Sequence, residues 1–206
     1  MADRWIADFW FDPSCPYTFI TSRWLVEVTT VRPVDVRWRV MSLSVLNEHR
    51  DDDPEGDPEG YLWVPVRVCA AVARHHGHDA LGRFYAELWS GADQDRVGQD
   101  WIGDLETALA AAGLPTSLAE AGTTEEYDDA VRASHQDGVR LVGDHTGTPV
   151  LAVTCPDGSR PAMFGPVLSQ VPHGERAGRL WDGVLLVTGV PGFHELKGRA
   201  PETGAG

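Results

Sequence analysis

The chain has 206 residues, of which 42% are hydrophobic, and it contains eight tryptophans and carries a formal net charge of −14. A chain of this length and composition can bury a core, as one large domain or as a small domain with an insertion, so intrinsic disorder is not expected. A surface this acidic repels phosphate groups, which argues against a nucleic acid or an anionic membrane as the partner.

The cellular compartment is suggested by what the sequence lacks. No run of about 18 uncharged apolar residues occurs, and the first ten residues are charged rather than arranged as a secretory signal. The three cysteines are odd in number and widely spaced, which argues against a disulfide framework. We therefore expect a cytoplasmic protein, in a reducing compartment where an unpaired thiol stays reactive.

The first 41 residues predict a parallel β-α-β unit. Residues 4–11 alternate polar and apolar, as in a buried strand, and residues 15–31 carry apolar side chains at helical spacing. Pro33 ends this helix, and residues 34–41 alternate again. The order strand, helix, strand therefore favours two neighbouring parallel strands.

The middle of the chain predicts a block of helices. Residues 51–60 (DDDPEGDPEG) are six acidic residues interrupted only by Pro and Gly, which is typical of a solvated loop. From residue 62 to about residue 140 every segment has helical spacing, with glycine stops. The last of these helices (TTEEYDDAVRASHQDG) is expected to begin at a threonine cap followed by an acidic first turn.

The C-terminal part predicts a hairpin and a helix. Strand signals at residues 150–154 and 162–164 are joined by a Pro-Asp-Gly turn, and a helix is expected over residues 174–188. The elements thus run β-α-β, then a helical block, then β-β-α, and without the block this is the order of the thioredoxin fold.

The predicted architecture is therefore α/β with two parts. We expect residues 1–60 and 141–206 to form a thioredoxin-fold domain, with helices on both faces of a four-stranded sheet. Residues 61–140 are expected to form an inserted all-helical subdomain that acts as a lid.

Cys15, in the segment DPSCPYTF, is the candidate nucleophile. A cysteine at the first turn of a helix faces unpaired backbone N–H groups and the positive end of the helix dipole. Both favour the thiolate and lower the pKa of a cysteine below its free value of about 8.5. Pro16 fits the first turn without loss of a hydrogen bond, and we expect the Thr18 hydroxyl to donate to Cys15 Sγ. The alternative is a buried, inert cysteine.

A second candidate feature is the Thr148–Pro149 dipeptide in VGDHTGTPV. In proteins of the thioredoxin fold, a cis-proline before this strand lies against the reactive cysteine, and the preceding residue offers backbone hydrogen bonds to a bound thiol. We predict a cis Thr148–Pro149 bond beside Cys15 Sγ, with an ordinary trans proline as the alternative. The helical insert is expected to roof this cleft, with Tyr17 at its lip.

The segments FWFDPSCPY, ITSRW, VMSLSVLNE, PVRV, AGLP, EEYDDAVRASH, GTPV, FGPVLS and LWDG together resemble the DsbA-like thioredoxin-fold enzymes, and most closely the actinobacterial mycothiol-dependent oxidoreductases of nitroreductase type. The resemblance implies a nucleophilic cysteine, here Cys15, a small-molecule substrate, and mycothiol or a similar low-molecular-weight thiol as cosubstrate. It also implies binding roles for Tyr17, Asn47 and Pro149, and no tightly bound cofactor.

The chain departs from this family at Thr18, where closer relatives carry cysteine, so the motif cannot close its own disulfide. Cys69, on an apolar helical stretch, and Cys155, at the hairpin turn, are poor substitutes. Kappa-class glutathione transferases and 2-hydroxychromene-2-carboxylate isomerases also have a lone residue there, and they use a bound thiol. Four functions stay open: a thiol-dependent oxidoreductase, a cis–trans isomerase that adds Cys15 reversibly to a double bond, a thiol transferase, and a non-catalytic binding module.

The remaining candidates are less specific. His135 either faces the pocket as a proton donor or is a packed or capping histidine. The histidines of residues 74–78 have no carboxylate or cysteine at ligand spacing, so no metal site is expected. Tyr61, Trp63 and Trp89 either line a substrate groove or belong to the core. A homodimer is left open.

Overall fold

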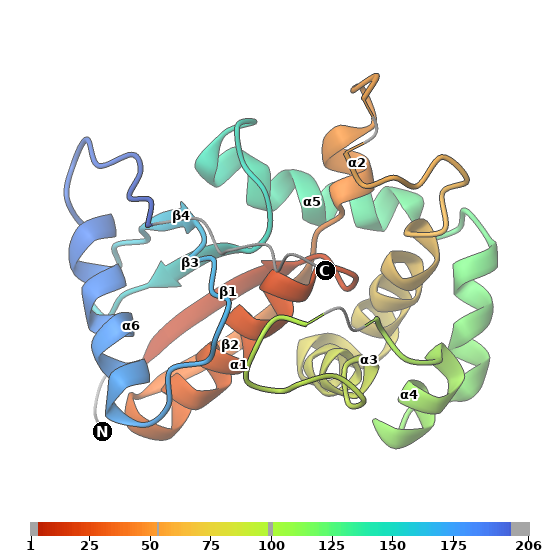
Figure 1. The fold of residues 1–206 in the computed structure, drawn as a ribbon, viewed down its shortest axis with the longest axis horizontal. Coiled ribbons are helices and arrows are strands. Elements are labelled where there is room, and N and C mark those ends of the chain that lie inside the picture. Colours follow the sequence, from red (N-terminus) through yellow and green to blue (C-terminus); the bar gives the residue numbers. More distant parts are fainter. Residues whose placement is uncertain (1–3, 53, 99–100, 199–206) are drawn as a thin grey trace.

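The computed structural model describes residues 4–52, 54–98 and 101–198, and in these residues one four-stranded sheet has the order β2-β1-β3-β4 (Figure 1). β1 is parallel to β2 and antiparallel to β3, and β4 is antiparallel to β3. The predicted parallel β-α-β unit and the predicted hairpin are therefore confirmed. The strands span Trp5–Phe11 (β1), Val34–Val40 (β2), Val150–Thr154 (β3) and Ala162–Phe164 (β4).

The helices follow the predicted order more closely at the two ends of the chain than in the middle. Gly77 lies inside the longest helix with φ of 80°, so the predicted glycine stop is present as a kink between two helical segments. The helices span Pro16–Val31 (α1), Leu43–Asn47 (α2), Trp63–Leu88 (α3), Leu105–Ala111 (α4), Asp128–Val142 (α5) and Glu175–Thr188 (α6), with a 3-10 helix, η1, at Thr116–Thr123.

The pleat of β1 divides its side chains between two hydrophobic clusters. Phe9 and Phe11 point into the larger cluster, which is shared with α1, α3 and α6. Trp10 points to the opposite face and packs with Val139 of α5 and with Val150 of β3. The sheet is thus covered by helices on both faces, and Figure 1 shows α5 on the side of the sheet opposite α1.

Helix α5 connects the predicted insert to the sheet. The indole N–H of Trp10 donates to Ser134 O (2.9 Å), and the Ser134 hydroxyl donates to Val40 O (2.7 Å). At its N-terminal end, Asp128 pairs with Arg67 of α3 at 2.7 Å. One helix therefore contacts both parts, and the division of the chain at residues 60/61 and 140/141 stays a prediction.

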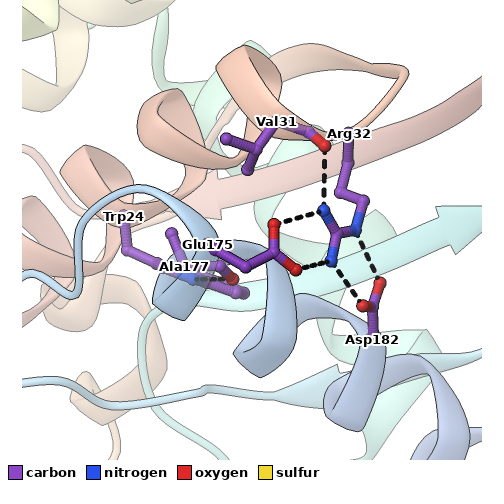
Figure 2. Close-up of polar contacts among 6 residues, drawn as sticks. All are labelled: Trp24, Val31, Arg32, Glu175, Ala177 and Asp182. Carbon is purple, nitrogen blue, oxygen red and sulfur yellow. Dashed lines mark hydrogen bonds and ion pairs between the residues drawn. The ribbon is translucent and has the colours of Figure 1, made fainter.

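Helices α1 and α6 are joined by polar contacts at the end of α1 (Figure 2). The guanidinium of Arg32, which follows α1, donates to both carboxylate oxygens of Asp182 and to Glu175, both on α6. Within the core, the indole N–H of Trp24 donates to Ala177 O at 3.1 Å. These bonds fix the C-terminal helix against the helix that follows Cys15.

Two predictions for the middle of the chain are wrong. The described residues between α3 and α4 are not helical, and Arg96 forms a β-bridge with Gln170 instead. The last helix of the block does not begin at a threonine, because the Thr123 hydroxyl donates to Glu120 O (2.9 Å) at the end of η1. Its N-cap is Tyr127, which makes no side-chain capping bond.

Within the described ranges, no helix is both long enough and apolar enough to cross a membrane.

Candidate active site

Cys15 is the N-cap residue of α1. Its backbone is extended (φ −86°, ψ 113°), Pro16 opens the helix, and the Cys15 carbonyl accepts the first helical bond from Phe19 N (3.0 Å). Its amide donates to Asp12 O at 3.3 Å, which closes the turn after β1. Cys15 is a half-buried residue, and its place as N-cap puts it at the positive end of the helix dipole.

Thr18 has a different partner from the one predicted. Its hydroxyl donates to Thr148 Oγ1 over 2.8 Å, and the Thr18 side chain is fully buried. A hydroxyl has one proton, so the predicted donation to Cys15 Sγ is not made, and none of the described contacts joins the two side chains. The bond instead ties the first turn of α1 to the residue before Pro149.

The Thr148–Pro149 peptide bond is cis, as predicted. Trp10 pairs with Val150 in the β1–β3 ladder, so the end of β1 and the start of β3 lie at the same edge of the sheet. Together with the Thr18–Thr148 bond, this register brings the cysteine turn and the proline loop together across most of the chain.

Asp12 is a buried carboxyl group that the sequence interpretation missed. It is 1% exposed and accepts hydrogen bonds from Ser14 N (2.8 Å) and from Leu43 N (2.7 Å), the first residue of α2. Burial raises the pKa of Asp12 to about 6 against the opposing effect of these two bonds, and the charge of Glu55 raises it further. An aspartate three positions before the candidate nucleophile was the available signal.

Asn47 lies at the end of α2 and donates to Glu55 Oε1 at 2.9 Å. Glu55 belongs to the acidic segment 51–60, which was expected to be simply solvated. Asp57 of the same segment accepts the amide protons of Tyr61 and Leu62 at 2.8 Å, just before α3. This part of the segment is therefore anchored to α2 and α3, on the Asp12 side of the site.

The other predicted binding residues differ in accessibility. Tyr17 is half-buried in the first turn of α1, and its carbonyl accepts a bond from Thr21 at 3.0 Å. His135 is 2% exposed, its Nδ1 accepts from Ser42 N at 3.5 Å, and burial lowers its pKa. This position favours the alternative of a packed histidine over a proton donor in an open pocket.

The inserted helix α3 reaches the cysteine turn through its last residues. The indole N–H of Trp89 donates to Pro13 O at 2.9 Å, and its ring stacks on Phe19 at 4.9 Å. Trp89 is 2% exposed, so it packs rather than lining an open groove. Trp63 lies elsewhere, with the guanidinium groups of Arg67 and Arg132 at 5.2 and 5.3 Å from the centre of its ring.

Residues 14–198 match the family described as Rv2466c-like, mycothiol-dependent nitroreductase Rv2466c. The chain belongs to this family. It is also 32% identical, over 198 residues, to the uncharacterized protein Rv2286c of Mycobacterium tuberculosis, a match that covers 92% of this chain and 80% of the relative. The predicted resemblance to mycothiol-dependent enzymes is thereby confirmed.

Solved structures show the same fold at low identity. A putative protein disulfide isomerase from Nitrosomonas europaea aligns with a TM-score of 0.54 and 15% identity, covering 89% of this chain and 98% of that one. The cytosolic disulfide reductase DsbM from Pseudomonas aeruginosa aligns with a TM-score of 0.52 and 19% identity, covering 88% and 99%. The predicted α/β thioredoxin fold of the DsbA-like type is confirmed, and the family places the chain among the thiol-dependent oxidoreductases.

In this member of the Rv2466c-like family, one of the other two cysteines is buried near Asp12 and the other lies away from the site. Cys69 of α3 is fully buried, and burial raises its pKa well above the ordinary value, so it stays a thiol. Cys155 follows Thr154, which pairs with Ile6 at the start of β1, whereas Cys15 follows the end of that strand. With a rise of about 3.3 Å per residue, the seven residues of β1 separate these ends by roughly 20 Å.

Two surface depressions lie away from the candidate site. They have volumes of about 530 and 510 Å³ and are bordered by the segment before α6 and by the turn after β3, and their linings include none of the predicted site residues. In the part of the chain that the structure describes, no three His, Cys, Asp or Glu side chains are grouped in a way that could hold a metal ion.

Proposed function

We propose that the protein uses Cys15 as its single nucleophile and depends on an external low-molecular-weight thiol, with mycothiol as the thiol that its family membership favours. The observation that carries the proposal is the isolation of Cys15. Cys69 is buried, Cys155 lies at the opposite end of β1, and Thr18 occupies the position of the missing second cysteine.

The chemistry follows from this isolation. The Cys15 thiolate attacks one sulfur of a disulfide, a mixed disulfide forms, and the other sulfur leaves as a thiolate. An external thiolate then attacks the sulfur of the bound group, releasing Cys15 as a thiolate and forming a new disulfide. Two sulfur–sulfur bonds form and two break, so the protein ends each cycle in its starting state.

The binding residues support this proposal by their placement. The cis Thr148–Pro149 bond is joined to the first turn of α1 by the Thr18–Thr148 hydrogen bond, and Tyr17 is a half-buried residue of that same turn, so we propose that both contact a group bound to Cys15 Sγ. We also propose that Asn47, held by Glu55, contributes to the binding of the small-molecule substrate from α2. The three unpaired cysteines favour a reducing, cytoplasmic compartment.

A trapped adduct tests the proposal. We expect incubation with mycothiol disulfide to add one mycothiol to the wild-type chain, as seen by intact mass, and excess thiol to remove it. Cys15→Ser should form no adduct, whereas Cys155→Ser should behave as the wild type. Full adduct formation, or full activity, in Cys15→Ser would rule the proposal out.

A second candidate function fits the same isolated cysteine. Reversible addition of Cys15 to a conjugated double bond allows rotation and then elimination, which isomerises the substrate without a resolving thiol. A thiol transferase would instead consume one thiol per turnover without forming a disulfide. Product formed without any added thiol favours isomerisation, and a stoichiometric disulfide product favours the oxidoreductase.

A further inference from the structure

Tyr85 of α3 lies beside the turn that carries Cys15. Its ring stacks on Phe11 with the centroids 3.9 Å apart and meets the ring of Phe19 edge-on at 6.1 Å. These two phenylalanines lie four residues before and four residues after Cys15, at the end of β1 and in the first turn of α1. Tyr85 is 1% exposed, so its phenol ring is held in one place by these contacts.

The hydroxyl of Tyr85 is buried without a hydrogen-bond partner. Buried polar atoms are paired in most proteins because an unpaired one costs free energy, so this hydroxyl requires an explanation. Ser22 lies close enough to lower the pKa of Tyr85, but no hydrogen bond of ordinary geometry joins the two hydroxyls. The proton of Ser22 goes to Phe19 O at 2.6 Å.

The charged groups that act on this hydroxyl are potential anions. Burial raises the pKa of Tyr85 well above its ordinary value, and negative charge on Cys15 and on Asp12 raises it further. Glu55 acts on Asp12 from the acidic segment, and Cys69, on the same helix as Tyr85, stays a protonated thiol because it is buried. Tyr85 is therefore a neutral donor, packed between Phe11 and Phe19 and within electrostatic reach of Cys15, the one partly exposed nucleophile of this cluster.

We propose that Tyr85 is the hydrogen-bond donor to the sulfur of Cys15 whenever that sulfur is negatively charged. This inference rests on the proposed function only in that Cys15 is the nucleophile. When an external thiolate opens the mixed disulfide, the electron pair of the broken bond stays on Cys15 Sγ. The O–H of Tyr85 then donates to that sulfur without giving up its proton. The inserted helix α3 thereby supplies the stabilisation that Thr18 does not.

Alkylation of Cys15 by iodoacetamide as a function of pH tests this role, with the rate followed by intact mass. The background is Cys155→Ser, which removes the other partly exposed thiol, and Cys69 is fully buried. Tyr85→Phe removes only the hydroxyl and keeps the stacked ring. We expect its alkylation rate at pH 7 to fall about tenfold, as for the loss of a hydrogen bond to a charged group, while the rate on the alkaline plateau is retained.

Two controls separate this role from a structural one. Ser22→Ala leaves the donor in place and should react as the background protein does. The melting temperature of Tyr85→Phe should not fall in acid, where thiols are protonated and the lost hydroxyl was unpaired. An unchanged pH profile in Tyr85→Phe would overturn the inference, as would an equal loss of rate at every pH, which indicates altered access. A Cys15 that is inert at every pH in the background protein would instead overturn the proposed function.

Discussion

At the scale of single residues, the pair Thr18–Thr148 decides what the cysteine motif can do. The two hydroxyls share a buried hydrogen bond of 2.8 Å, and Thr148 is 6% exposed. The fourth position of the motif thus faces the proline loop, and it is held there by a bond that a thiol would make only weakly. The motif thus contains one cysteine, and its fourth residue ties the first turn of α1 to the proline loop.

Replacing that residue should restore a two-cysteine site. Thr18 lies in the first turn of the helix that begins after Cys15, and Cα atoms three residues apart on a helix are about 5 Å apart, within the Cα separation of about 4.4–6.8 Å that a disulfide spans. We expect Thr18→Cys to have four titratable thiols when reduced and unfolded, the three native ones and the introduced one, and only two after mild oxidation.

The control for this change is Thr18→Ser, which keeps the hydroxyl and should retain its three thiols under the same oxidation. A Thr18→Cys protein that still has four free thiols after oxidation, with both cysteines of the motif open to alkylation, contradicts the placement of Thr18 next to Cys15.

At the scale of elements, α1, the helix that follows Cys15, packs against α6. Trp24 of α1 and Trp181 of α6 are both fully buried, with ring centroids 6.3 Å apart. They differ in their polar atoms: the indole N–H of Trp24 donates to Ala177 O, whereas that of Trp181 has no partner. The two tryptophans fill similar volumes, so a matched pair of substitutions isolates the value of the hydrogen bond.

We expect Trp24→Phe to be the more destabilising of the two changes. Both remove the same atoms from one core, but only Trp24→Phe also loses a hydrogen bond, while Trp181→Phe removes an unpaired donor. The free energy of unfolding should therefore fall by about 1–2 kcal/mol more in Trp24→Phe than in Trp181→Phe, as measured by urea titration with fluorescence. Equal losses would mean that the Trp24–Ala177 bond contributes nothing.

At the scale of the whole molecule, local patterns predicted the sheet and long-range contacts escaped prediction. The four strands and helices α1 and α6 lie within one residue of the predicted ends, because alternation, helical spacing and Pro or Gly breakers are local signals. The non-helical chain around Arg96 depends on its pairing with Gln170, which no local pattern encodes. The partner of Thr18 was missed for the same reason, since it lies 130 positions away.

The burial of Asp12 was likewise invisible in the sequence, since it depends on α2 and α3 closing over the turn after β1. Its carboxylate accepts bonds from Ser14 N and Leu43 N, so its protonation state affects how the cysteine turn is joined to α2. The stability of the whole chain should therefore report on this one group.

We expect Asp12 to destabilise the folded protein as the pH rises through its pKa. The folded-state pKa of about 6 lies above the ordinary value of 3.8, so the folded state binds the extra proton between these values, and stabilisation that is fully present below pH 3.8 is lost as the pH rises through 6. The gap between the two values corresponds to about 3 kcal/mol, at about 1.4 kcal/mol for each pH unit. The unfolding free energy of the wild type minus that of Asp12→Asn should therefore be about 3 kcal/mol smaller at pH 7 than at pH 3.5.

Asp35→Asn is the matched control with the opposite sign. The hydrogen bond from Arg4 lowers the pKa of Asp35, so the unfolding free energy of the wild type minus that of Asp35→Asn should grow with pH. A wild-type advantage over Asp12→Asn that is constant, or that rises with pH, would show that the folded-state pKa of Asp12 is not raised above 3.8.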